Sequence, residues 1–135
     1  MKTFLQILLF VLMVTQMSFA QWYQQTSGNK NALYDVFFLD TSNGIAVGKG
    51  GTILKTTDGG ANWMIQTSGT TNQLRAIFLI DSNTGTIVGG SSTILRTTDG
   101  GEIWNSKSTG TSTTYYGVAF TDASNGIVVG QGEQS

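Results

Sequence analysis

The 135-residue chain contains no histidine, no cysteine and no proline, and only 11% of its residues are charged. The missing side chains exclude a serine–histidine–aspartate triad, a cysteine nucleophile, a thiolate or imidazole metal site and a disulfide within these residues. The formal net charge is −1. Because nucleic acids and anionic membranes attract basic proteins, we expect neither as a partner. Glycine is abundant instead, with 18 residues.

The first 20 residues have the features of a signal peptide. Lys2 provides a positive charge, residues 4–14 are apolar apart from Gln6, and small side chains precede Gln21, where we expect cleavage. The apolar stretch is shorter than the roughly 20 residues that a helix needs to span a bilayer, so we expect no stable membrane anchor. The sequence therefore predicts a protein exported to the periplasm, the cell surface or the extracellular space.

An internal repeat of 41 residues runs through the rest of the chain. The tryptophans Trp22, Trp63 and Trp104 are separated by 41 residues each. Residues 52–60 (TILKTTDGG) match residues 93–101 (TILRTTDGG) at all positions but one. This register predicts one structural unit that is used repeatedly.

Each repeat contains four short runs with β-strand character, separated by turn sequences. In the first repeat these runs are 33–39, 45–48, 52–56 and 63–67. Four strands in about 40 residues, repeated without helical periodicity, are typical of a propeller. We therefore predict an all-β fold, a β-propeller of four-stranded antiparallel blades.

The repeat also predicts the domain organisation. After the signal peptide (residues 1–20), the partial propeller comprises the outer strand of a closing blade (21–32), a first blade (33–73), a second blade (74–114) and the start of a third (115–135). These are about 2.8 units, whereas closed propellers need roughly four to eight blades. We expect an N-terminal fragment of a chain of about seven units, with a small protein that closes by oligomerising as the alternative.

The turn between the third and fourth runs carries the motif [ST]-x-D-x-G-x-x-W. The two copies place their motif residues at Thr56, Asp58, Gly60, Trp63, Thr97, Asp99, Gly101 and Trp104. The motif resembles the Asp-box, or BNR repeat, of the sialidase-like propellers. The stretch FFLDTSNGIAVGKGGTILKTTDGGANW is similar to the photosystem II stability and assembly factor family. This resemblance implies a protein partner, which would be a photosystem II subunit only in a photosynthetic host.

We interpret the Asp-box residues as structural. The carboxylate of Asp58 can accept hydrogen bonds from its own turn and from Thr56, and we expect the ring of Trp63 to pack against the adjoining sheet. One carboxylate in each turn supplies too few oxygens for calcium, and recurrence in every unit indicates a structural role. We therefore predict no catalytic residue, no metal site and no cofactor.

One position of the repeat provides the candidates for a binding site: Tyr34, Arg75 and Tyr116. These residues lie near the start of the first strand, which lines the central channel in propellers. They either contact a ligand or partner at the channel mouth or are ordinary rim residues beside a water-filled tunnel.

Two functions remain open. The first is a non-catalytic exported propeller that acts as a protein-binding or assembly module. The alternative is a sialidase-like or xyloglucanase-like glycoside hydrolase whose catalytic residues lie mostly outside this segment. Hydrolysis would need two inward carboxylates from different blades or three clustered arginines, whereas this chain has only Arg75 and Arg96. We therefore favour a protein that is not an enzyme.

Overall fold

The computed structural model describes residues 22–107 and 109–132. Every regular element in this part of the chain is a strand, apart from one short 3₁₀ turn, so the all-β prediction is confirmed. The predicted signal peptide lies outside the described residues. Within them, no helix has the length and hydrophobicity required to cross a membrane.

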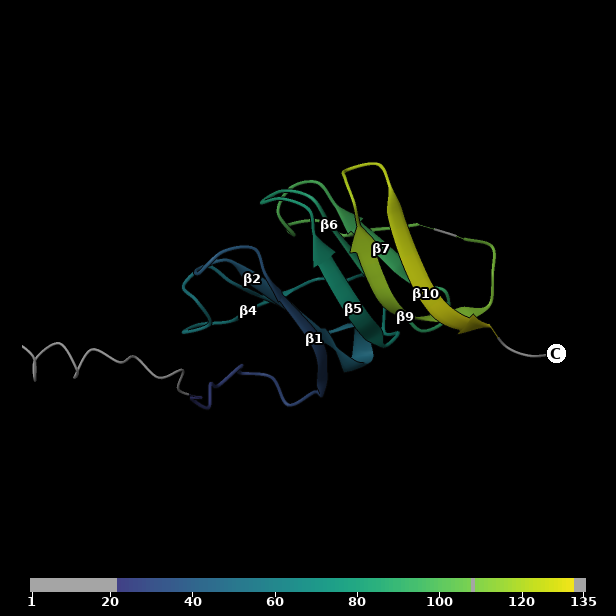
Figure 1. The fold of residues 1–135 in the computed structure, drawn as a ribbon. Coiled ribbons are helices and arrows are strands. Elements are labelled where there is room, and N and C mark those ends of the chain that lie inside the picture. Colours follow the sequence, from purple (N-terminus) through teal and green to yellow (C-terminus); the bar gives the residue numbers. More distant parts are fainter. Residues whose placement is uncertain (1–21, 108, 133–135) are drawn as a thin grey trace, which may run out of the picture.

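The strands form three antiparallel sheets (Figure 1). The first contains β1 (Leu33–Phe38), β2 (Gly44–Gly48), β3 (Ile53–Thr56) and β4 (Met64–Gln66) in that order, and η1 (Lys49–Gly51) joins β2 to β3. The second repeats this order with β5 (Leu74–Leu79), β6 (Gly85–Gly89), β7 (Ile94–Thr97) and β8 (Asn105–Ser106). The third contains β9 (Thr113–Phe120) and β10 (Gly126–Gly132).

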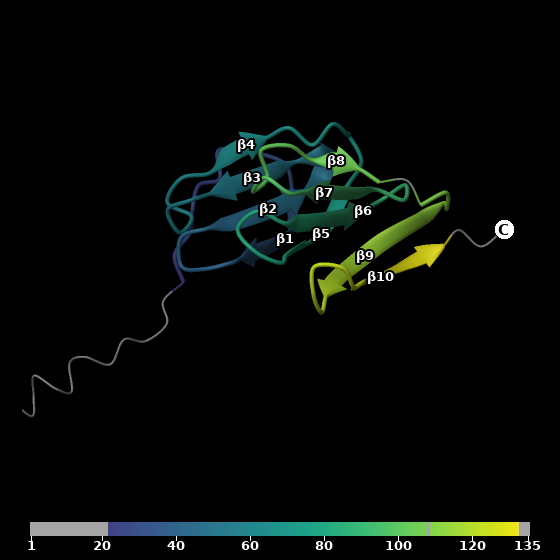
Figure 2. The same cartoon turned by 90° about the horizontal axis from the view of Figure 1, so that it is seen from above.

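The first strands of the three sheets lie beside one another. β1 contacts β5, and β5 contacts β9, while β4 and β8 lie at the far edge of their sheets (Figure 2). This is the arrangement of propeller blades, in which the first strand of each blade faces the central channel. The described residues thus form two four-stranded blades and two strands of a third, an incomplete propeller.

The core lies between the first and second sheets. All five residues of β2 and all five of β6 are buried, because each of these strands has neighbours on both edges and a packed sheet on at least one face. Ile45 and Val47 of β2 pack with Ile77 and Leu79 of β5. Every residue of β10 is exposed, since no third strand pairs with it in the described part of the chain.

Two glycines allow the chain to approach its own backbone. A Cβ atom on Gly48 would lie 2.2 Å from the carbonyl oxygen of Ala32, and one on Gly89 would lie 2.0 Å from that of Gln73. Glycine is therefore required at the end of β2 and of β6, where the residue just before the first strand of the same blade comes into contact with the second strand.

The segment that precedes the first blade differs from its repeat equivalents. Residues 22–32 contain no strand, and Trp22 is fully exposed. The prediction that this segment supplies the outer strand of a closing blade stays a prediction, because the described residues contain no blade that it could complete.

Candidate functional site

The Asp-box turns are closed by hydrogen bonds among their own residues. In the first blade, the Thr56 hydroxyl donates to Asp58 Oδ1 at 2.9 Å and accepts the N–H of Gly60 at 2.9 Å. The backbone N–H of Asn62 donates to Asp58 Oδ1, and its side-chain amide donates to Oδ2, both at 2.8 Å. The Asn62 amide, its backbone N–H and the Thr56 hydroxyl lower the pKa of Asp58.

The second blade repeats this turn with one difference. The Thr97 hydroxyl donates to Asp99 Oδ1 at 2.8 Å, and the backbone N–H of Ile103 donates to the same oxygen at 3.0 Å. Residue 103 is isoleucine where the first blade has Asn62, so within residues 22–107 and 109–132 no side-chain amide donates to the second oxygen of Asp99. Both carboxylates are occupied in holding the bend of their own hairpin.

The two Asp-box tryptophans lie in different environments. Trp104 is 7% exposed and belongs to the core between the first two sheets. Trp63 is only half-buried and meets Phe38 edge to face, with 6.1 Å between ring centroids. Trp104 packs towards the blade before its own, and no complete blade precedes Trp63 in the described residues. The expected burial of Trp63 between sheets is therefore not observed.

The structure brings Tyr34, Arg75 and Tyr116 together in one row. The strand pairing shifts register at this position in each blade: between Leu33 and Asp35, between Leu74 and Ala76, and opposite Val129 and Gly130. A β-bulge leaves one residue outside the regular pairing and redirects its side chain. The bulges therefore place the three side chains along the same end of the inner strands.

Arg75 is the centre of this row. Its guanidinium carbon lies 5.3 Å from the centroid of the Tyr34 ring and 5.2 Å from that of Tyr116, which are cation–π contacts on both sides. One terminal nitrogen donates to Gln73 Oε1 at 2.6 Å. The Nε atom is buried and makes no hydrogen bond within the described residues. The two ring contacts and the hydrogen bond to Gln73 thus hold Arg75 in one orientation.

Asp35 is a further participant, which the sequence did not place beside the row. Its Oδ2 accepts the N–H of Ile77 on β5 at 2.9 Å, and its Oδ1 accepts the N–H of the neighbouring Val36. The equivalent residues are Ala76 and Gly117. Asp35 therefore links the first two blades just beyond the bulge that carries Arg75. The sequence feature that could have indicated this role is a carboxylate in one copy of the repeat where the other two copies have small residues.

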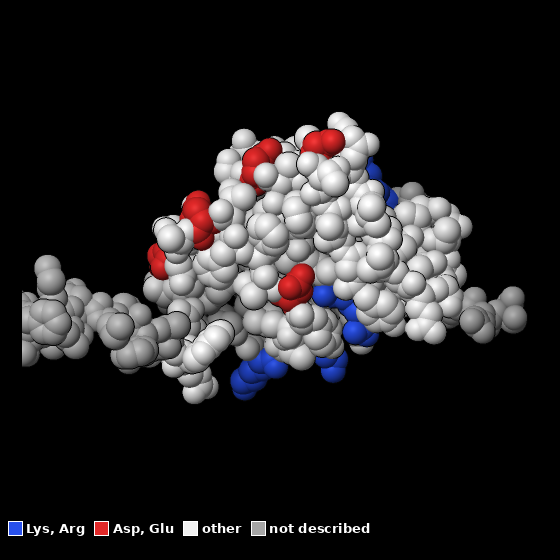
Figure 3. Space-filling view, in the orientation of Figure 1, with Lys and Arg blue, Asp and Glu red and all other residues white. Residues whose placement is uncertain are grey.

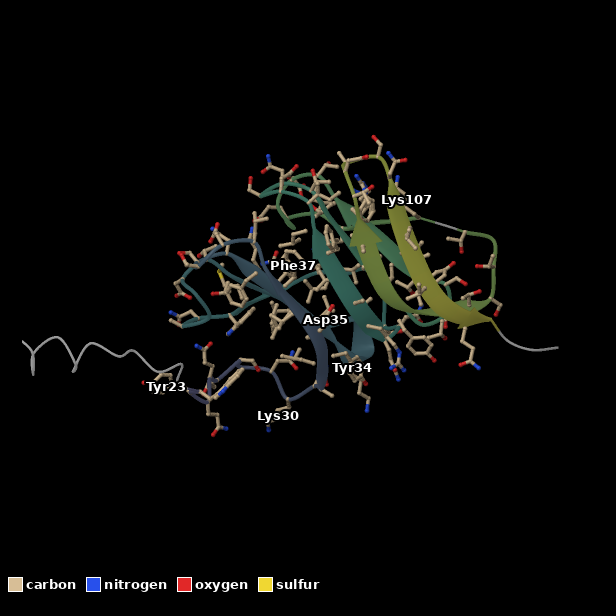
Figure 4. The ribbon with its side chains drawn as sticks, in the orientation of Figure 1. Tyr23, Lys30, Tyr34, Asp35, Phe37 and Lys107 are labelled. Atoms are coloured by element: carbon tan, nitrogen blue, oxygen red, sulfur yellow. The ribbon has the colours of Figure 1, made fainter. Side chains whose placement is uncertain are left out.

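Charge is distributed unevenly over the molecule (Figure 3). We call the end that carries the β1–β2, β3–β4 and equivalent turns the Asp-turn face; its acidic residues are Asp40, Asp58, Asp81, Asp99, Glu102 and Asp122. In Figure 3 most acidic side chains lie along the upper rim and most basic ones along the lower rim. Tyr34 and Lys30 lie at this lower side in Figure 4. A partner that docks on the row therefore meets the more basic end.

Metal and cofactor binding have no visible basis among the described residues. No group of three or more acidic side chains there is arranged to hold a metal ion. The prediction that the chain has no cofactor remains a prediction.

Comparison with known proteins agrees with the geometry. The solved structure described as "YCF48 bound to D1 peptide" superposes with a TM-score of 0.72 at 22% identity, over 84% of this chain and 38% of that one. A second, YCF48 from Cyanidioschyzon merolae, gives 0.69 at 16% identity, over 82% and 38%. This chain thus spans little more than a third of those structures' length. No curated protein matches it in sequence.

One protein-family model matches the sequence over a range that includes both four-stranded sheets. The model described as "Photosynthesis system II assembly factor YCF48" matches residues 14–106, well over half of the chain. The chain therefore belongs to the YCF48 photosystem II assembly factor family of β-propellers.

Proposed function

We propose that this chain is part of an exported, non-catalytic propeller that binds a segment of another protein at the row formed by Tyr34, Arg75 and Tyr116. The observation that carries the proposal is the fixed guanidinium of Arg75. It lies between two tyrosine rings and donates a hydrogen bond to Gln73, so these contacts fix its position. Tyrosine and arginine are, with tryptophan, the side chains most enriched among those that dominate protein–protein binding.

The family supports this function. One solved relative is bound to a D1 peptide, so the same propeller type holds a protein segment in at least one case. We extend protein binding in general to this chain. A D1 peptide serves only as a test ligand, since a photosystem II partner requires a photosynthetic host. The signal-peptide features of residues 1–20 support the proposed export.

Binding of a labelled D1 peptide to the full chain, followed by fluorescence anisotropy, tests the proposal. Replacing Arg75→Gln should weaken binding by about tenfold or more, because a central arginine at an interface contributes strongly. Lys49→Gln is the matched control, since it removes a positive charge outside the row. Equal binding by wild type and Arg75→Gln would overturn the assignment of the row, and turnover of a sialoside or xyloglucan would overturn the non-catalytic function.

A further inference from the structure

A small cleft opens on the Asp-turn face between the first and second blades. Its floor is apolar, formed by Leu39, Ile45 and Leu79, and its rim includes Lys55 and Asp81. The cleft has a volume of about 170 Å³. This combination of an apolar floor and polar groups at the edge is typical of a site for a small chemical group.

The internal repeat shows what fills the equivalent place between the second and third blades. There the guanidinium of Arg96 lies over the Phe120 ring, 5.4 Å from its centroid. It donates to the carbonyl oxygen of Ala123 at 3.1 Å and to the Thr86 hydroxyl at 3.2 Å. The chain's own arginine thus demonstrates how a guanidinium binds at this position of the blade interface.

The corresponding residues of the first interface are Lys55, Leu79 and Ser82, and all three line the cleft. Lys55 does not reproduce the contact of Arg96, because its ammonium lies 2.9 Å from Glu102 of the second blade. Leu79 is smaller than the phenylalanine that stands at its place in the next repeat. Both substitutions leave space where Arg96 and Phe120 meet in the other interface.

The acceptor that a cation requires is supplied by Asp81. Its Oδ1 accepts the backbone N–H groups of Asn83 and Thr84. In the equivalent turns, the side-chain amide of Asn43 or Asn125 also donates to the second aspartate oxygen, at 2.8 Å in each case. Thr84 replaces that asparagine here, so within the described residues no side-chain amide donates to Asp81 Oδ2. The two backbone N–H groups lower the pKa of Asp81 most, and the Thr84 side chain and the positive charge of Arg96 lower it to a smaller extent.

We propose that this cleft binds an arginine side chain of a partner protein. The aliphatic part of the arginine would cover Leu39, Ile45 and Leu79, and the guanidinium would meet the carboxylate of Asp81 and the carbonyl of Ser82. The surrounding aspartates of the Asp-turn face favour a cation over a neutral group. This second contact surface lies at the opposite end of the blades from the Tyr34–Arg75–Tyr116 row and does not depend on it.

The probe is N-acetylarginine amide, titrated into the ¹⁵N-labelled full chain while the backbone amide signals of Ser82 and Gly100 are followed. N-acetylcitrulline amide is the control, because its urea group has the shape of guanidinium without the charge. We expect the arginine probe to shift these signals and to bind about tenfold more tightly than the citrulline probe. Equal binding of the two probes, or shifts confined to other residues, would overturn the proposal.

Matched variants locate the site. Asp81→Asn keeps the acceptor of the turn but removes the charge, and should weaken the arginine probe by about tenfold. Asp122→Asn makes the same change in the third blade and should leave binding unchanged. Lys55→Arg supplies the chain's own guanidinium to the cleft and should reduce binding even if Asp81→Asn proves unstable. Undiminished binding by Lys55→Arg, or equal losses in the two aspartate variants, would contradict this site.

Discussion

The turn aspartates of the Asp-turn face are held by donors from their own turns. In Asp40, Asp58 and Asp122 an asparagine side-chain amide is the main cause of a lowered pKa. In Asp81 and Asp99 a backbone N–H is the main cause. Each residue therefore contributes to folding in its ionised form.

This ionisation predicts loss of stability in acid. A carboxylate whose pKa is lower in the folded than in the unfolded state stabilises the fold above its unfolded pKa, about 3.9 for aspartate. That contribution disappears as the pH falls through the folded pKa. We expect the free energy of unfolding, measured with urea at a series of pH values, to be level between about pH 5 and 7 and to fall below about pH 4.

Asp58→Asn provides the control for this pH dependence. Asparagine keeps an acceptor for Thr56 but cannot titrate, so the variant should show a shallower decline in acid than the wild type. A decline that is unchanged by Asp58→Asn would show that the acid effect arises from other groups.

The two Asp-box tryptophans should differ in their contribution to stability. Trp104→Ala removes a ring buried between two sheets and should cost about 3 to 5 kcal/mol of unfolding free energy. Trp63→Ala removes a half-buried ring and should cost no more than about half of that. Urea unfolding of both variants measures the difference. Equal costs would mean that Trp63 is packed as fully as Trp104 in solution.

At the scale of the strands, the backbone of Gln73 passes close to the end of β6, and two adjacent glycines there should respond differently to substitution. A Cβ on Gly89 would lie 2.0 Å from the carbonyl oxygen of Gln73, whereas one on Gly90 would lie 3.9 Å from the same atom. Gly89→Ala forces backbone movement and should destabilise the protein by about 1 to 3 kcal/mol. Gly90→Ala should change stability by less than about 0.5 kcal/mol. Thermal unfolding of the pair measures this, and similar melting temperatures would contradict the backbone contact.

The bulges are the feature of the inner strands that the sequence pattern did not predict. The predicted run 33–39 locates β1 to within one residue at its end, since β1 spans Leu33–Phe38. A bulge adds one residue without changing the local composition, so Tyr34 and Arg75 look like ordinary strand residues in the sequence. Only the strand pairing shows that Tyr34 has no partner residue on β2 and that Arg75 has none on β6.

At the scale of the whole molecule, two apolar surfaces remain uncovered in the described residues. Val36 and Phe38 are exposed on the first sheet, and Ile127 and Val129 are exposed on β10. Uncovered apolar faces and an unpaired strand edge favour association. We expect a protein consisting of residues 22–135 to form oligomers as its concentration rises, measured by sedimentation velocity. The double variant Val36→Lys and Ile127→Lys should shift it towards monomer, and a wild type that stays monomeric throughout would contradict this.

The sequence by itself determined the repeat, the strand order within a blade and the chemistry of the turns, because these depend on residues close together in the chain. Tertiary structure decided how residues 41 positions apart meet. It placed Arg75 between Tyr34 and Tyr116, and it directed Arg96 onto Phe120 while leaving a cleft beside Lys55. Equivalent positions in a repeat share a backbone, but their surroundings come from the neighbouring blades, and those differ from one interface to the next.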